Sequence, residues 1–154
     1  MKVYLDTSAL NRVFDDQSQA RIYLESTSMQ LIFLLIENEI IEIISSDALV
    51  FETERNPYSD RQTFVELVLQ KAKYFQAITQ EVLQKAEQLE VLNKIKGIDA
   101  LHLACAEVIR ADWFITCDDK LMKRYSGSLN VKNPVEAATV LINSLEEEEE
   151  NENS

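Results

Sequence analysis

Short apolar runs that alternate with helix-like segments constrain the fold of this chain most strongly. Residues 2–6 form the first run, and residues 40–45, 113–116 and 129–131 form three later ones. The first three are rich in β-branched and aromatic residues, which are typical of strands. The segments between the runs carry apolar residues at helical spacing. Strands that alternate with helices predict a three-layer α/β/α sandwich with a mostly parallel central sheet.

Caps and apolar stripes place the helices between these runs. Ser8, Ser46 or Asp47, and Thr79 are predicted to begin helices, and Gly97 suits the left-handed position after a helix. Phe75 is taken as part of the apolar stripe of a helix that begins at residue 59. The predicted helices are residues 9–14, 18–37, 47 to before 57, 59 onward, 80–96, 98–110, 119–125 and 134–145.

The charge distribution divides the chain into two parts. The net charge is −12, and residues 146–152 contain six acids and no basic residue, so removing these six leaves −6 for residues 1–145. We expect one domain over residues 1–145 and a disordered acidic tail over residues 146–154. Such a charge predicts weak long-range attraction of nucleic acid.

Composition excludes several classes of protein. The two cysteines form no C-x-x-C pair and there is one histidine, so neither a structural zinc site nor a disulfide framework is indicated. The longest apolar stretch, residues 31–36, is too short to span a bilayer. An acid at position 6 comes too early for a signal peptide. We therefore expect a cytoplasmic protein without a membrane segment.

Four acids stand where one predicted element gives way to the next. Asp6 ends the first strand, and Asp118 follows the strand at residues 113–116. Glu52 lies six residues after Ser46, which closes the second strand, and Asp99 opens a helix. The carboxyl ends of parallel strands meet in one crevice, where such folds bind ligands. Acids gathered there repel one another, and a divalent cation resolves the repulsion. The sequence therefore predicts a site for a divalent metal ion.

These acids also have structural explanations or neighbouring acids that compete for the same role. Asp6 or Asp119 could cap a helix, Asp99 could interact with the dipole of its own helix, and Glu54 competes with Glu52 for the inward position. A phosphatase D-x-D motif and an integrin-type D-x-S-x-S motif both fail at residues 6–10. His102 is expected to be a satisfied buried histidine.

Other residues are predicted to support the acids or to bind phosphate. Thr7, Ser8 and Thr116 carry hydroxyls beside the acids, and Asp119 could act in the outer shell. Phosphate contacts require cations near the crevice. The candidates for nucleic-acid binding are Arg12, Arg55, Lys120, Lys123 and Arg124.

Four segments in order resemble the PIN domain, the family that includes the VapC-type toxin ribonucleases of bacterial toxin–antitoxin pairs. These segments are residues 5–10, Ser46 with Glu52, residues 99–104 and residues 114–118. Each motif alone is weak, but all four with compatible spacing are specific. They lie between residue 3 and about residue 125, and the family fold would extend to about residue 145.

The resemblance implies an endoribonuclease that depends on Mg²⁺ or Mn²⁺. It maps the family's acidic quartet, as catalytic and metal-binding residues, onto Asp6, Glu52, Asp99 and Asp118, and its supporting hydroxyl onto Thr116. It also implies an RNA substrate, a homodimer and possible restraint by an antitoxin protein. The acidic surface favours one alternative, a non-catalytic PIN-fold module that acts through protein contacts.

Overall fold

The central sheet of the protein is wholly parallel. The fold is taken from a computed structural model, which describes residues 1–153. The strands lie in the order β3-β2-β1-β4-β5. They are β1 (Lys2–Leu5), β2 (Glu42–Ser46), β3 (Tyr74–Gln76), β4 (Trp113–Ile115) and β5 (Val131–Lys132). The middle strand β1 pairs with β2 on one side and with β4 on the other, so its side chains are almost completely buried.

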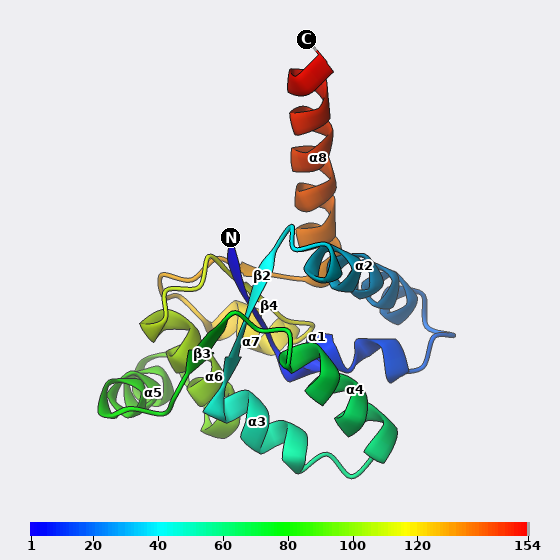
Figure 1. The fold of residues 1–154 in the computed structure, drawn as a ribbon. Helices are drawn as coiled ribbons and strands as arrows, with labels where there is room; N and C mark the ends of the chain where they lie inside the picture. The colour runs from blue at the N-terminus through cyan, green and yellow to red at the C-terminus, as the bar shows by residue number, and fades with distance from the viewer. Residues whose placement is uncertain (154) are drawn as a thin grey trace.

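Helices cover both faces of this sheet (Figure 1). Helix α2 packs against α8, whereas α5 packs against α6 on the opposite side. This is the three-layer α/β/α sandwich predicted from the sequence. The helices are α1 (Thr7–Leu10), α2 (Ala20–Glu37), α3 (Asp47–Glu54), α4 (Ser59–Leu69), α5 (Gln80–Asn93), α6 (Gly97–Val108), α7 (Asp119–Arg124) and α8 (Pro134–Asn153), with a 3₁₀ turn, η1, at Arg12–Phe14.

The strand order reverses between β1 and β4. The chain runs from β1 outward to β2 and β3, then returns to β4 and β5 on the other side of β1. In parallel α/β sheets such a reversal opens a crevice at the carboxyl ends of the strands. Asp6 follows β1 and donates its backbone N–H to the Ile115 carbonyl of β4 at 2.9 Å. This carboxylate therefore lies at the reversal point.

Several local predictions differ from the structure. The predicted helix over residues 9–14 is split into α1, capped by Asp6 instead of Ser8, and the 3₁₀ turn η1. Helix α5 ends at Asn93, followed by Lys94 in the left-handed conformation (φ 55°). Gly97 also has a positive φ, of 60°, but it begins α6.

Two larger differences lie at the sheet edge and at the end of the chain. The strand β3 was not predicted; its Phe75 belongs to an edge strand and is 55% exposed. Helix α8 continues through residues 146–153, for which the sequence predicted a disordered tail. The second half of α8 extends away from the rest of the molecule (Figure 1). Glutamate is a good helix former, and a helix already started by packing on α2 lengthens at little cost.

Candidate functional site

Asp6 is the most tightly held carboxylate at the strand ends. It is 3% exposed. Its Oδ1 accepts the backbone N–H of Thr7 at 2.9 Å, and its Oδ2 accepts the hydroxyls of Ser8 at 2.8 Å and Thr116 at 2.7 Å. Ser8 and Thr116 in turn accept backbone N–H groups of Cys117 and Asp118 at 3.1 Å. The predicted hydroxyl residues therefore fix Asp6 and join β1 to the loop after β4.

Glu52 reaches the same crevice from α3. Ser46 at the end of β2 caps this helix, accepting the Leu49 N–H at 3.1 Å, and so sets its direction. The Thr7 hydroxyl donates to Glu52 Oε1, and His102 Nε2 lies 3.3 Å from the same oxygen. Burial acts to raise the pKa of Glu52, but these hydrogen bonds outweigh burial and lower it. The carboxylate is therefore held in its charged form, with both contacts on one oxygen.

A buried chain of hydrogen bonds lies behind Glu52. The Tyr4 hydroxyl is 2.7 Å from Ser46 Oγ and 2.7 Å from His102 Nδ1, and all three residues are fully buried. Burial raises the pKa of Tyr4 well above its usual value, so the phenol stays neutral. A charged carboxylate only accepts hydrogen bonds, so His102 Nε2 carries the proton that faces Glu52. In the neutral imidazole with this tautomer, Nδ1 is the acceptor and the Tyr4 hydroxyl donates to it.

Asp99 is the acid whose charge is least compensated. Burial, followed by the charges of Asp6 and Asp118, raises its pKa from 3.8 to about 6; Glu52 adds to the rise and His102 opposes it. Within residues 1–153, no hydrogen bond or ion pair holds its carboxylate. Asp99 lies in the first turn of α6 and is one helical turn from His102. Asp99 is thus close enough to the other three predicted acids for their charges to raise its pKa.

Asp118 and Asp119 have different roles. Asp118 caps α7: its Oδ1 accepts the N–H groups of Lys120 at 3.0 Å and Leu121 at 3.2 Å. Asp119 instead forms a two-point ion pair with Arg21, at 2.6 and 2.7 Å. The sequence assigned Asp119 a supporting role beside the acids; its carboxylate is engaged with α2 instead.

The donor set fits a hard divalent cation. Oxygen or nitrogen atoms of Asp6, Glu52 and His102 lie within 4.8 Å of one another. His102 Nε2 is directed at Glu52, which leaves the carboxylate oxygens as the atoms better placed to hold a metal. Glu52 Oε2 has no hydrogen bond among residues 1–153, and Asp99 has no partner for either oxygen. Mg²⁺ and Mn²⁺ prefer such carboxylate oxygens.

Cys117 borders the acids but does not suit this site. Burial raises the pKa of its thiol to about 12, so it is protonated at neutral pH. Metal binding by cysteine requires the thiolate.

Three of the predicted basic residues lie on α7, and the other two, Arg12 and Arg55, line a cleft beside Glu52. Lys120, Lys123 and Arg124 are exposed on α7, directly after Asp118. Arg12 is engaged elsewhere: Nε and Nη2 contact the buried Glu25 at 3.0 and 2.8 Å, and Nη1 contacts Asp15 at 3.0 Å. Arg12 therefore fastens η1 to α2 and has few donors left for phosphate.

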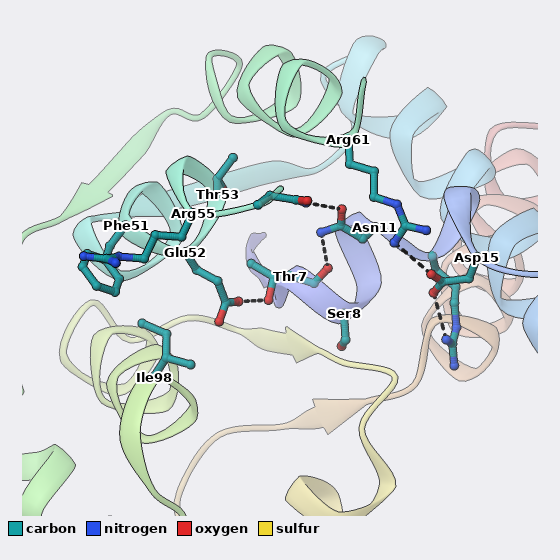
Figure 2. Close-up of a pocket in the computed structure, with 12 residues that line it drawn as sticks. Thr7, Ser8, Asn11, Asp15, Phe51, Glu52, Thr53, Arg55, Arg61 and Ile98 are labelled. Atoms are coloured by element: carbon teal, nitrogen blue, oxygen red, sulfur yellow. Dashed lines mark hydrogen bonds and ion pairs between the residues drawn. The ribbon is translucent and has the colours of Figure 1, made fainter. Parts of the chain in front are cut away.

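A cleft of about 670 Å³ opens beside the acids. Figure 2 shows Glu52 and Thr7 near its centre, Phe51, Arg55 and Ile98 toward one end, and Arg61 with Asp15 toward the other. The guanidinium of Arg55 lies over the Phe51 ring, 4.1 Å from its centroid. Arg61 donates to Asp15 at 3.1 Å and to the Phe14 carbonyl at 3.0 Å.

Sequence reasoning did not identify Tyr4 as part of the site. A usable signal existed, because Tyr4 is two residues before Asp6 and side chains alternate along a strand, so both point to one face. His102 is likewise one turn after Asp99. Arg61, Asn11 and Asn56 at the cleft gave no such signal, because their contacts join segments far apart in the sequence.

Comparison with known families identifies this fold. A model of the PIN domain family matches residues 3–127. No curated protein sequence matches the chain significantly.

Solved structures with the same fold include three from different organisms. The crystal structure of VapBC2 from Rickettsia felis, bound to a DNA fragment from its promoter, contains a chain with a TM-score of 0.57 and 17% identity, covering 86% of this chain and 98% of that one. FitAcB from Neisseria gonorrhoeae gives a TM-score of 0.56 at 16% identity, covering 86% and 97%. PAE2754 from Pyrobaculum aerophilum gives 0.54 at 17% identity, covering 94% and 99%.

Proposed function

Because this chain belongs to the PIN domain family, we propose that it is a divalent-metal-dependent endoribonuclease. The proposal is carried by the proximity of Asp6 and Glu52 where the strand order reverses, together with the effect of the Asp6, Glu52 and Asp118 charges on Asp99. Asp99 in particular is half-buried beside other acids without a compensating partner. A cation that binds all these charges would remove a repulsion that the fold otherwise maintains.

The chain's own residues provide a rigid, prearranged set of ligands. Three donors hold Asp6, and Thr7 and His102 hold one oxygen of Glu52. The other Glu52 oxygen and the Asp99 carboxylate are the groups we assign to direct metal contact. Asp118 uses Oδ1 to cap α7, and we assign its Oδ2 to the metal or to a metal-bound water.

The bound Mg²⁺ or Mn²⁺ would lower the pKa of a water molecule and stabilise the charge that develops on the phosphate. The roles of the side chains are then to orient this centre and to keep its ligands charged. The hydrogen bonds that lower the pKa of Glu52 serve the second role. No nucleophilic side chain is required, and both cysteine thiols are buried.

A cleavage assay tests this proposal. Purified wild-type protein and an Asp99→Asn variant would be incubated with a mixed panel of RNAs in Mn²⁺, Mg²⁺ or EDTA. We expect cleavage by the wild type with either metal and none in EDTA or by the variant. Circular dichroism of the variant checks that it remains folded. Equal activity in EDTA and metal would reject a metal-dependent nuclease.

A protein partner is a second proposal that one surface feature favours. A groove of about 240 Å³ lies between α2 and α4 and is lined by Phe33, Phe64 and the 54% exposed Leu67. We propose that an apolar segment of an antitoxin-like protein binds there. Co-purification with a small protein encoded beside this gene, lost in Leu67→Asp, tests it; retained binding by the variant would reject the groove. A homodimer, tested by sedimentation, remains a prediction from the resemblance, and a cytoplasmic location remains a prediction from the composition.

The helices of the described chain include no membrane span: none within residues 1–153 is both long enough and apolar enough to cross a bilayer.

A further inference from the structure

One end of the cleft beside the acids combines an aromatic ring with an unpaired guanidinium. Phe51 is 48% exposed, although it belongs to a helix that also contributes to the core. Arg55, the C-cap residue of α3, lies one turn later and covers the ring at 4.1 Å. Among the three arginines that line the cleft, Arg12 and Arg61 pair with Asp15, whereas Arg55 has no acid partner in residues 1–153.

The position of this pair relative to the acids is informative. Phe51 directly precedes Glu52, and Ile98 directly precedes Asp99. Phe51 and Ile98 both line the cleft, and Figure 2 shows them near each other at the end that Arg55 occupies. The two helices that supply acids to the centre thus each supply an apolar wall next to it. A group bound between Phe51 and Ile98 would therefore lie next to the carboxylates of Glu52 and Asp99.

We propose that this end of the cleft is a nucleobase subsite for single-stranded RNA. The base of a nucleotide flanking the scissile phosphate stacks on Phe51, and Arg55 both extends the stacking surface and contacts an adjacent phosphate. This inference rests on the proposed function and names how that site holds its substrate. Proteins that bind single strands without strict sequence preference use such aromatic platforms next to cations.

Physical considerations favour a single strand over a duplex. Stacking needs the flat face of an unpaired base, which a double helix does not expose. The cleft volume of about 670 Å³ is within the range of pockets that enclose small ligands. The overall charge of −12 disfavours a mode that depends on many phosphate contacts. Base stacking supplies affinity without requiring many phosphate contacts.

The pair at spacing i, i+4 also stabilises α3, so the test must separate stacking from helix stability. Binding of short fluorescent single-stranded RNAs would be measured by anisotropy in an Asp99→Asn background, which leaves the RNA intact. Phe51→Ala should weaken binding between about 5-fold and about 150-fold, and Phe51→Trp should restore it. Phe75→Ala removes a similarly exposed phenylalanine from the edge strand and should leave binding unchanged.

Abasic substitution makes the test specific for a base. With Phe51 present, removing one base of the RNA should weaken binding at one position near the cleavage point. In Phe51→Ala, removing the base at that position should no longer weaken RNA binding. Unchanged affinity of Phe51→Ala, or an abasic effect that persists in it, would overturn the subsite even if wild-type protein cleaves RNA. Absence of metal-dependent cleavage by wild type would instead reject the proposed function.

Discussion

Removal of one hydroxyl, by Tyr4→Phe, tests whether the buried chain behind Glu52 supports the site. The Phe side chain keeps the ring volume and the stacking on Phe114, whose ring centroid is 5.3 Å away. Only the hydrogen bonds to Ser46 and His102 disappear, each 2.7 Å long. The bare Nδ1 of His102 then has no donor in a fully buried position.

The size of the effect follows from that unsatisfied atom. A buried polar group without a partner costs about 1–3 kcal/mol. For a domain of this length, each kcal/mol shifts the Tm by about 2–4 °C, so we expect a fall between about 2 and about 12 °C. His102 can also move its proton to Nδ1, which would present a lone pair to Glu52. Residues that orient metal ligands typically change metal affinity or activity by about 10- to 100-fold.

Thermal unfolding and calorimetric titration with Mn²⁺ would measure the two effects separately. The matched control is Tyr125→Phe, which also removes a tyrosine hydroxyl. That hydroxyl donates to Glu107 and accepts the Leu129 N–H, and neither partner is one of the four predicted site acids. Both variants should have a lower Tm, but only Tyr4→Phe should bind Mn²⁺ more weakly. If both variants keep wild-type Mn²⁺ affinity, the chain has no role beyond stability.

Three other predictions concern charged residues. Asp99 has a raised pKa of about 6, so its contribution to stability is greatest below pH 3.8 and declines as the pH rises to about 6. Asp99→Asn should therefore melt at a higher temperature than wild type in EDTA at pH 8, with no such gain near pH 3.5; lower stability at pH 8 would contradict the charge repulsion. Lys123→Ala with Arg124→Ala should reduce the salt slope of RNA binding by about 0.7 for each phosphate that the protein no longer neutralises, and an unchanged slope would remove α7 from the interface. Deletion of residues 146–154 should leave the Tm nearly unchanged, because residues 146–153 are exposed; a large fall would reveal packing by this end of α8.

The layer architecture and the position of the acids that follow strands were predictable because they depend on local patterns. Apolar runs identify central strands that are buried on both faces, and parallel strands place their carboxyl ends together. That logic brings Asp6 and Asp118 to one crevice without any knowledge of distant contacts, whereas Asp99 follows no strand and lies in the first turn of α6. Glu52 was favoured over Glu54 by helical geometry, and its hydrogen bonds with Thr7 and His102 agree with that choice.

What could not be predicted depends on packing between distant segments. The edge strand β3 leaves Phe75 half exposed, so no alternation of buried and exposed residues marks it as a strand. The pairing of Arg21 with Asp119 joins positions 98 residues apart, and no local pattern signals it. The tail has the composition of a disordered segment, yet it continues a helix that is anchored by α2.

Binding of Mn²⁺ by the intact protein tests the central claim most directly. Calorimetric titration would compare wild type with Asp6→Asn, a variant in which the amide keeps the shape of the side chain but loses its charge. We predict saturable Mn²⁺ binding by the wild type and its loss in Asp6→Asn, with both proteins folded by circular dichroism. Equal binding by the two proteins would contradict a metal site built on the acids at the strand ends.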